Sequence, residues 1–408
     1  MDAIKFIHTA DLHLDSPFKG LNHLPTPIFK KLKESTFVSF NRIIELAISE
    51  HIDFVLVAGD LFDNHIRSLK AQISLRKGFE RLEEAGICVY VIHGNHDHLG
   101  GSWAELTWPE NVYFFSENVE VTPFQKKGKT LAYIHGFSYE KRAVTENMVK
   151  YYHKKEDDLF HIGMLHGNLE GKDEHDPYAP FTINQLLEKN FDYWALGHIH
   201  KRQILHENPT IIYPGNIQGR HRKEFGDKGC FVVELTKLET KQRFVPCAPI
   251  VWETENITID SLVTVDELII AIKTCKERYR NLRQGAIVTI NLLGSGLLHE
   301  ELNDSQFIND LCDIVNEGEE LAENFVWVAS CQNNTAIPYN RNLLKSEAHF
   351  ISDLLQQVDD YNDDFFEEAL GMLLKNHKVN PFLQNVKEDR REILVKAERL
   401  LLHELLKG

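Results

Sequence analysis

Short apolar runs alternate with longer amphipathic segments through roughly the first 235 residues of the chain. The short runs predict buried strands at 4–8, 54–58, 89–93, 131–135, 162–165, 193–196 and 211–213. Residues 28–50 and 68–85 place apolar side chains at helical spacing, and Gly86 suits the end of the second helix. Strands that alternate with helices predict an α/β domain with parallel pairing between its strands.

The length of the chain indicates more than one domain, because 408 residues exceed the size of one typical core. The pattern changes near residues 246–252 and then resumes on a smaller scale. Strands are expected there at 253–259, 286–293 and 325–330, and helices at 264–280 and 304–317. We therefore expect a first domain at 1–245, a small α/β accessory domain at 246–338 and a helical C-terminal segment at 339–408.

The C-terminal segment is rich in leucine and phenylalanine. Short exposed helices need fewer apolar side chains than this segment carries. Two explanations remain open: the helices pack on the body of the protein, or they dock a helix or coiled coil of a partner.

Composition excludes several classes of protein. No apolar stretch reaches the length of about 18 residues that a membrane span needs, and the first residues do not form a secretory signal. No two of the six cysteines lie within four residues of each other, so we expect reduced thiols in a cytoplasmic protein. The formal net charge of -16 counts against a protein that coats nucleic acid, but not against a metal-dependent nuclease, because metal ions supply local positive charge.

Five polar clusters each follow one of the apolar runs directly. They are Asp11-Leu12-His13, Gly59-Asp60-Leu61-Phe62-Asp63, Gly94-Asn95-His96-Asp97, His166-Gly167 and Gly197-His198-Ile199-His200. The loops at the carboxyl ends of parallel strands share one edge of a sheet, so these clusters are expected to converge. Together they offer carboxylate, amide and imidazole ligands without a thiolate, which favours manganese, iron or zinc in a hydrolytic site.

The clusters resemble the calcineurin-like metallophosphoesterase superfamily, whose pattern is DxH, GDxxD, GNHD, a later histidine and GHxH. All five blocks match, over roughly residues 1–235. The opening Ile-His-Thr-Ala-Asp-Leu-His-Leu and the Gly-Asp-Leu-Phe-Asp block are similar to SbcD-type nuclease subunits, above all to the YhaO-type bacterial branch, described as DNA repair exonucleases. The resemblance implies an α/β fold with a metallophosphoesterase-type β-sandwich flanked by helices.

The resemblance also implies a two-metal centre, with Mn2+ expected and Fe2+ or Zn2+ as alternatives. One metal would be held by Asp11, His13, Asp60 and His200, and the other by Asp60, Asn95, His166 and His198. His96 would face the substrate as the catalytic residue, stabilising developing charge or donating a proton to the leaving oxygen. Asp63 and Asp97 would orient the ligands or, alternatively, cap turns.

Three functions remain open from the sequence. The first is a DNA exonuclease or endonuclease in DNA repair that works with an SMC-like (SbcC-like) coiled-coil ATPase, and related nucleases are dimers. The second is a phosphodiesterase of small nucleotides or other phosphoesters. The third is a structural or regulatory subunit, which the intact ligand set disfavours because a scaffold needs no such set.

A basic cluster follows the last motif by about twenty residues. Its members Arg220, Arg222 and Lys223 are expected to bind DNA phosphates flanking the scissile one, since a chain of this net charge must contact DNA locally. The alternative is an exposed, solvated loop.

Overall fold

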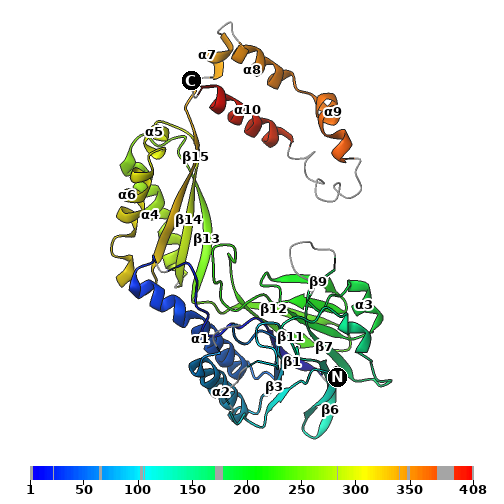
Figure 1. Ribbon diagram of the computed structural model, residues 1–408. Coiled ribbons are helices and arrows are strands. Elements are labelled where there is room, and N and C mark those ends of the chain that lie inside the picture. The colour runs from blue at the N-terminus through cyan, green and yellow to red at the C-terminus, as the bar shows by residue number, and fades with distance from the viewer. Residues whose placement is uncertain are drawn as a thin grey trace. The chain divides into compact units, whose positions relative to one another are not determined.

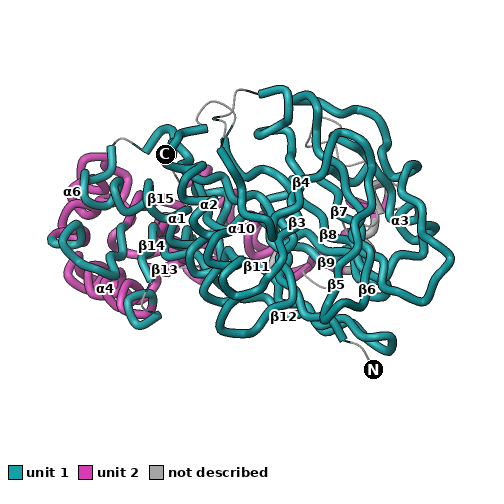
Figure 2. The backbone as a smooth tube through the Cα atoms, turned by 90° about the horizontal axis from the view of Figure 1, so that it is seen from below, with its two compact units in different colours: residues 1–253, 279–287, 318–327 teal, residues 254–278, 288–317, 328–408 magenta. Residues whose placement is uncertain are grey.

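The computed structural model describes residues 3–21, 23–63, 67–101, 104, 106–170, 178–282, 284–339, 341–346, 350–374 and 390–406. The chain divides into two compact units (Figure 2). Unit 1 comprises residues 1–253, 279–287 and 318–327, and unit 2 comprises residues 254–278, 288–317 and 328–408. The three-domain division at 245 and 338 stays a prediction.

Unit 1 contains a sandwich of two six-stranded sheets (Figure 1). The first has the order β12-β11-β1-β2-β3-β4, and its strands are Thr240–Pro246, Gly229–Leu235, Ile4–Thr9, Phe54–Ala58, Cys88–Ile92 and Val112–Phe114. The second has the order β5-β6-β7-β8-β10-β9, and its strands are Glu120–Lys126, Lys129–Gly136, Phe160–His166, Tyr193–Gly197, Thr210–Tyr213 and Gln203–Glu207. The expected β-sandwich is confirmed.

The seven predicted strands pair in parallel where they neighbour one another, as expected. The sheets also contain antiparallel pairs, which are β1 with β11, β11 with β12, β5 with β6, and β9 with β10. Exposed residues recur along β5, β9 and β12, which therefore lack the uninterrupted apolar run of a buried parallel strand, whereas β11 is buried at every residue except Glu234. Both sheets are mixed.

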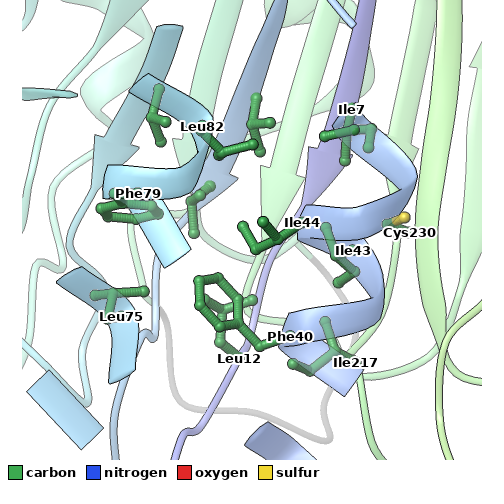
Figure 3. Close-up of a cluster of buried hydrophobic side chains, with 14 of the residues drawn as sticks. Ile7, Leu12, Phe40, Ile43, Ile44, Leu75, Phe79, Leu82, Ile217 and Cys230 are labelled. Atoms are coloured by element: carbon green, nitrogen blue, oxygen red, sulfur yellow. The ribbon is translucent and has the colours of Figure 1, made fainter. Parts of the chain in front are cut away.

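Apolar packing fixes the layers of the sandwich. Side chains from both sheets fill the space between them, including Phe6, Phe54, Met164 and Tyr193. On the outer face of the first sheet lie α1 (Thr26–Ser49) and α2 (Leu69–Glu84), whose inner faces meet β1 in the cluster drawn in Figure 3. The short α3 (Ile183–Glu188) and the 3-10 helix η1 (Met148–Tyr151) pack on the second sheet. Helices thus cover both outer faces of the sandwich, and the ends of its strands stay uncovered by these helices.

A small sheet follows, in the order β13-β14-β15, made of Ile250–Thr258, Gly285–Ser295 and Val326–Ala336. The first two strands run parallel, because Gly285 N donates to Pro249 O near their starts and Ile259 N donates to Leu293 O near their ends. The helices between the strands are α4 (Val265–Asn281), α5 (His299–Leu302) and α6 (Ser305–Asn316), followed by the 3-10 helix η2 (Glu319–Leu321). This is the small α/β element that the sequence predicts.

The C-terminal residues form α7 (Arg341–Ser346), α8 (Phe350–Asp360), α9 (Asp363–Leu374) and α10 (Arg390–Leu406). Arg341 connects three of them, since its guanidinium donates to Asp359 of α8 and Glu398 of α10. The helical prediction is confirmed for these residues, and residues 375–389 lie outside the described part of the chain. Among the described helices, none combines the length and the apolar character that a membrane span requires.

Candidate metal centre

The five motif clusters lie at one end of the sandwich, at the carboxyl ends of β1, β2, β3, β7 and β8. The backbone bends sharply there: Asp11, His13, Asp60 and His198 have φ values of 51°, 42°, 55° and 99°. Left-handed conformations are costly for residues with a side chain, so the surrounding structure must enforce them. Part of that enforcement is direct, because Asp11 N donates to Gly59 O and His13 N donates to Asp60 O.

The first group of candidate ligands comprises Asp11, His13, Asp60 and His200, whose ligating atoms lie within 4.8 Å of one another. The two imidazole Nε2 atoms, of His13 and His200, are 3.1 Å apart. Nδ1 of His200 lies 2.7 Å from Glu224 Oε1, and Nδ1 of His13 lies 3.0 Å from Asp63 Oδ1. A carboxylate only accepts, so each ring carries its proton at Nδ1.

This arrangement leaves two unprotonated Nε2 atoms facing each other beside two carboxylates. Two lone pairs cannot form a hydrogen bond with each other. A cation between them satisfies both, and Asp11 Oδ1 at 3.9 Å from His200 Nε2 and Asp60 Oδ2 at 3.8 Å from His13 Nε2 supply negative charge. The group therefore fits a divalent metal ion.

The second group contains Asn95, His166 and His198, with Asp60 at its border. Nδ1 of His166 lies 2.9 Å from Ala58 O and donates to it, so Nε2 is the ring nitrogen that faces the other candidate ligands. That Nε2 is 3.0 Å from Asn95 Oδ1 and 3.5 Å from Asp60 Oδ2. Asn95 Oδ1 is also 3.2 Å from Nδ1 of His198. This group has oxygen and nitrogen ligands of the kind that the first group has.

Asp60 lies between the two groups and is 1% exposed. Burial acts to raise its pKa, but the neighbouring imidazoles, His166 first, hold the pKa well below the usual range of an aspartate. Conversely, burial acts to lower the pKa of His166, and the negative charge of Asp60 overcomes this and raises it to about 9. Without a metal, a proton on His166 thus compensates the buried carboxylate. Both groups together are consistent with two divalent ions that share Asp60.

Close packing around these ligands requires small residues. A Cβ on Gly94 would lie 2.3 Å from Asp60 Oδ1 and 2.6 Å from His166 Nε2. Asp97, which is fully buried, accepts hydrogen bonds from the backbone N–H of Leu61 (2.8 Å) and of Gly94 (2.7 Å). Asp97 thereby links the loop after β2 to the loop after β3. A residue that orients the ligands of these two loops is expected to make such contacts.

His96 lies at the border of the first group. Its backbone N–H donates to Asp60 Oδ1 at 2.9 Å, and its Nδ1 is 3.6 Å from Asp63 Oδ1. Ligating atoms of His13, Asp63 and His96 also come within 4.8 Å of one another, but Asp63 already binds Arg220 Nη1 at 2.8 Å. Burial lowers the pKa of His96 to about 4, so its ring is neutral at neutral pH.

Sequence reasoning missed Glu224, which is 7% exposed and contacts His200. Its carboxylate also accepts from Asn216 Nδ2 at 2.8 Å and Arg220 N at 2.7 Å. Burial acts to raise the pKa of Glu224, but the hydrogen bond from His200 and the charges around it lower the pKa well below the usual range. The only sequence signal was its position inside the basic cluster, where a lone acid carries little information.

The three residues expected to bind DNA have different surroundings. Arg220 is mostly buried and donates to Asp63, and its Nη2 lies 3.2 Å from His200 Nδ1. Arg222 and Lys223 are exposed. Arg220 thus lies against the candidate ligands, and the other two face solvent.

Comparison with known proteins bears on this site. A family model described as calcineurin-like phosphoesterase matches residues 4–202. The Bacillus subtilis protein named "Uncharacterized metallophosphoesterase YhaO" is 45% identical over 411 residues, which cover 98% of each chain. "DNA double-strand break repair protein Mre11" of Sulfurisphaera tokodaii is 29% identical over 58% of this chain and 61% of its own length.

A component of the nuclease SbcCD from Staphylococcus saprophyticus is 26% identical over 60% of this chain and 70% of its own. These two relatives therefore match only part of the chain, whereas the Bacillus subtilis relative matches nearly all of it. The match with that relative and the convergence of five motif clusters on paired metal-ligand groups lead to one assignment: this chain belongs to the calcineurin-like metallophosphoesterases and is a metal-dependent phosphoesterase.

Proposed function

We propose that this protein is a two-metal phosphodiesterase that hydrolyses DNA and acts as a nuclease in DNA repair. The observation that carries the two-metal part is Asp60, a buried carboxylate whose Oδ2 lies 3.8 Å from His13 Nε2 in one group and 3.5 Å from His166 Nε2 in the other. The DNA part draws its support from the relatives named for Mre11 and for the nuclease SbcCD.

The roles of the chain's own groups follow from their positions. Asp11, His13, Asp60 and His200 would hold one ion, and Asp60, Asn95, His166 and His198 the other. When bound, two divalent ions activate water and stabilise the negative charge of the attacked phosphate. Mn2+ suits this mixed oxygen and nitrogen set, as do Fe2+ and Zn2+.

His96 is the proposed group for the leaving oxygen. Its side chain is 30% exposed, so substrate can reach the ring, and its backbone is fixed by Asp60. A neutral imidazole donates a hydrogen bond to the developing charge. Negative charge from a bound phosphodiester would also raise its pKa, which favours transfer of a proton to the leaving sugar oxygen.

A phosphodiesterase of small nucleotides is the second candidate. The formal net charge of -16 favours it, because a long polyanion is repelled by an acidic protein beyond the immediate site. The two candidates differ in the substrate that the site admits, not in the metal centre.

The test is incubation of the purified protein with labelled single- and double-stranded DNA, with Mn2+ or with EDTA. Metal-dependent shortening of the polymer is expected. Hydrolysis of dinucleotides together with intact DNA would replace the nuclease proposal by the second candidate. An Asp60→Ala preparation made in parallel controls for a contaminating nuclease.

The C-terminal helices are proposed to dock a coiled-coil ATPase of the SbcC type, and a homodimer is a further possible assembly. Apolar side chains on these helices are exposed, among them Leu343, Phe350, Phe365 and Leu400, and this supports a docking role. Removing the residues after 340 should abolish binding of the ATPase in a pull-down and leave hydrolysis of a small diester intact. Equal binding by the truncated protein would contradict the docking role.

A further inference from the structure

A tight loop at residues 219–227, called here the 219–227 loop, begins and ends on one buried tryptophan. The indole Nε1 of Trp252 donates to Gly219 O at 2.9 Å, and Gly226 N donates to Trp252 O at 3.0 Å. Between these points Glu224 N donates to His221 O, which closes a turn. The loop is therefore anchored at both ends and ordered by its own hydrogen bonds.

The position of the loop follows from strand pairing. β11 begins two residues after the loop and runs antiparallel to β1, with Phe231 opposite His8. The start of β11 thus lies at the carboxyl end of β1, where Asp11 and His13 follow. The inner side of the loop contacts the candidate metal centre directly, through Glu224 on His200 and Arg220 on Asp63.

The exposed side chains of the same loop include two cations, an aromatic ring and the carboxylate of Asp227. Arg222 and Lys223 are exposed, and Phe225 is 64% exposed. Phe225 directly follows Glu224, whose carboxylate touches His200, so the exposed ring lies one residue from a group that contacts the centre. The ring therefore offers an apolar face that a flat ligand can cover.

We propose that the 219–227 loop is a nucleobase subsite, in which Phe225 stacks on a base near the scissile phosphate. Arg222 and Lys223 contact the adjoining phosphates. This inference rests on the proposed action on DNA and names the part of the substrate that is recognised. Proteins bind single strands without reading sequence by combining exposed aromatic rings with basic side chains, because every base offers a flat face.

The subsite predicts a preference for unpaired bases. A base inside a duplex is covered on both faces, whereas a base at a frayed end or in a single strand is free to stack. Loss of one stacking contact to alanine typically costs about 1–3 kcal/mol, which corresponds to about 5- to 150-fold in kcat/KM.

The experiment removes the Phe225 ring from the protein and one base from the substrate, separately and together. A single-stranded oligonucleotide is prepared with one abasic nucleotide, moved stepwise along the strand, and kcat/KM is measured with Mn2+ for the wild type and Phe225→Ala. For the wild type, one abasic position should lower kcat/KM about 5- to 150-fold. Phe225→Ala should show a loss of this size on the intact strand and no further loss at that abasic position.

Two further variants act as controls. Phe225→Trp keeps an aromatic face and should retain the sensitivity to the abasic position. Tyr151→Ala removes another exposed aromatic ring of unit 1, one that hydrogen-bonds to Glu146, and should behave as the wild type. Hydrolysis of bis(4-nitrophenyl) phosphate by each variant reports an intact centre.

The outcomes separate the two proposals. If the wild type cleaves the oligonucleotide and Phe225→Ala is as sensitive to the abasic positions as the wild type is, the subsite is refuted and the nuclease function still stands. A wild type that hydrolyses the small diester but no oligonucleotide would refute the nuclease function, and the base subsite with it.

Discussion

His8 connects the two sheets beneath the candidate metal centre and makes the fold sensitive to acid. It lies on β1, is fully buried, and bonds two residues of β8: Nδ1 lies 3.0 Å from the Tyr193 hydroxyl, and Nε2 lies 3.1 Å from Leu196 O. Nε2 donates to the carbonyl and Nδ1 accepts from the hydroxyl, so the ring is neutral. Burial lowers the pKa of His8 to about 3.

The lowered pKa of His8 determines how the stability of the fold changes with pH. A histidine of the unfolded chain has a pKa of about 6.5, so the unfolded state takes up the proton first as pH falls. The free energy of unfolding is therefore unaffected by His8 above pH 7 and decreases from about pH 6.5 towards 3. At about 1.36 kcal/mol for each pH unit, His8 alone removes about 2 kcal/mol at pH 5.

His8→Gln tests this value, because glutamine offers one donor and one acceptor and does not titrate. Urea unfolding followed by tryptophan fluorescence in EDTA at pH 7.5 and 5.0 gives the loss of stability for each protein. The loss should be about 2 kcal/mol smaller in His8→Gln than in the wild type. His153→Gln, at an exposed position, should keep the wild-type loss. Equal losses in wild type and His8→Gln would refute the assignment of a neutral buried ring.

Three further predictions concern the candidate metal centre. Asp60→Ala should reduce metal content from about two ions per chain to nearly none by mass spectrometry, because both groups share this carboxylate; full occupancy would show that Asp60 does not bridge. His96→Ala should lower diester hydrolysis by about 100- to 10,000-fold with unchanged metal content, whereas loss of an ion would make His96 a ligand. Glu224→Gln should weaken Mn2+ binding by about 10- to 100-fold in calorimetry because a neutral amide replaces the carboxylate that accepts from His200 Nδ1; an unchanged affinity would limit Glu224 to a structural role.

The sequence was most informative about the parallel strands and the clusters that follow them. A strand buried on both faces reads as an uninterrupted apolar run, so β2 was placed at the residues that the structure assigns, 54–58. The antiparallel edge strands were harder to predict, since β12 reads Thr-Lys-Gln-Arg-Phe-Val-Pro, without an apolar run at its start, and has exposed residues along its length. Such a strand resembles a polar loop until its partner is known.

The contacts among the residues of the candidate metal centre could not be predicted from the sequence. Asp97 was expected to orient ligands, but its acceptance from Leu61 N and Gly94 N depends on how two loops meet. Arg220 was assigned to DNA phosphates from its charge alone, and its pairing with Asp63 joins residues 157 positions apart. Charge and spacing do not encode such a pairing.

By itself, the sequence determined the candidate ligands and the order in which they occur, because each cluster ends an apolar run and parallel strands present their carboxyl ends at one edge. Only the tertiary structure decided which carboxylate holds which imidazole. Glu224 reaches His200 because the antiparallel pairing of β11 with β1 puts the loop before β11 beside the end of β1, where Asp11 lies 3.9 Å from the His200 ring that follows β8. Strand order and direction depend on the packing of the whole sandwich, and no local pattern of residues specifies them.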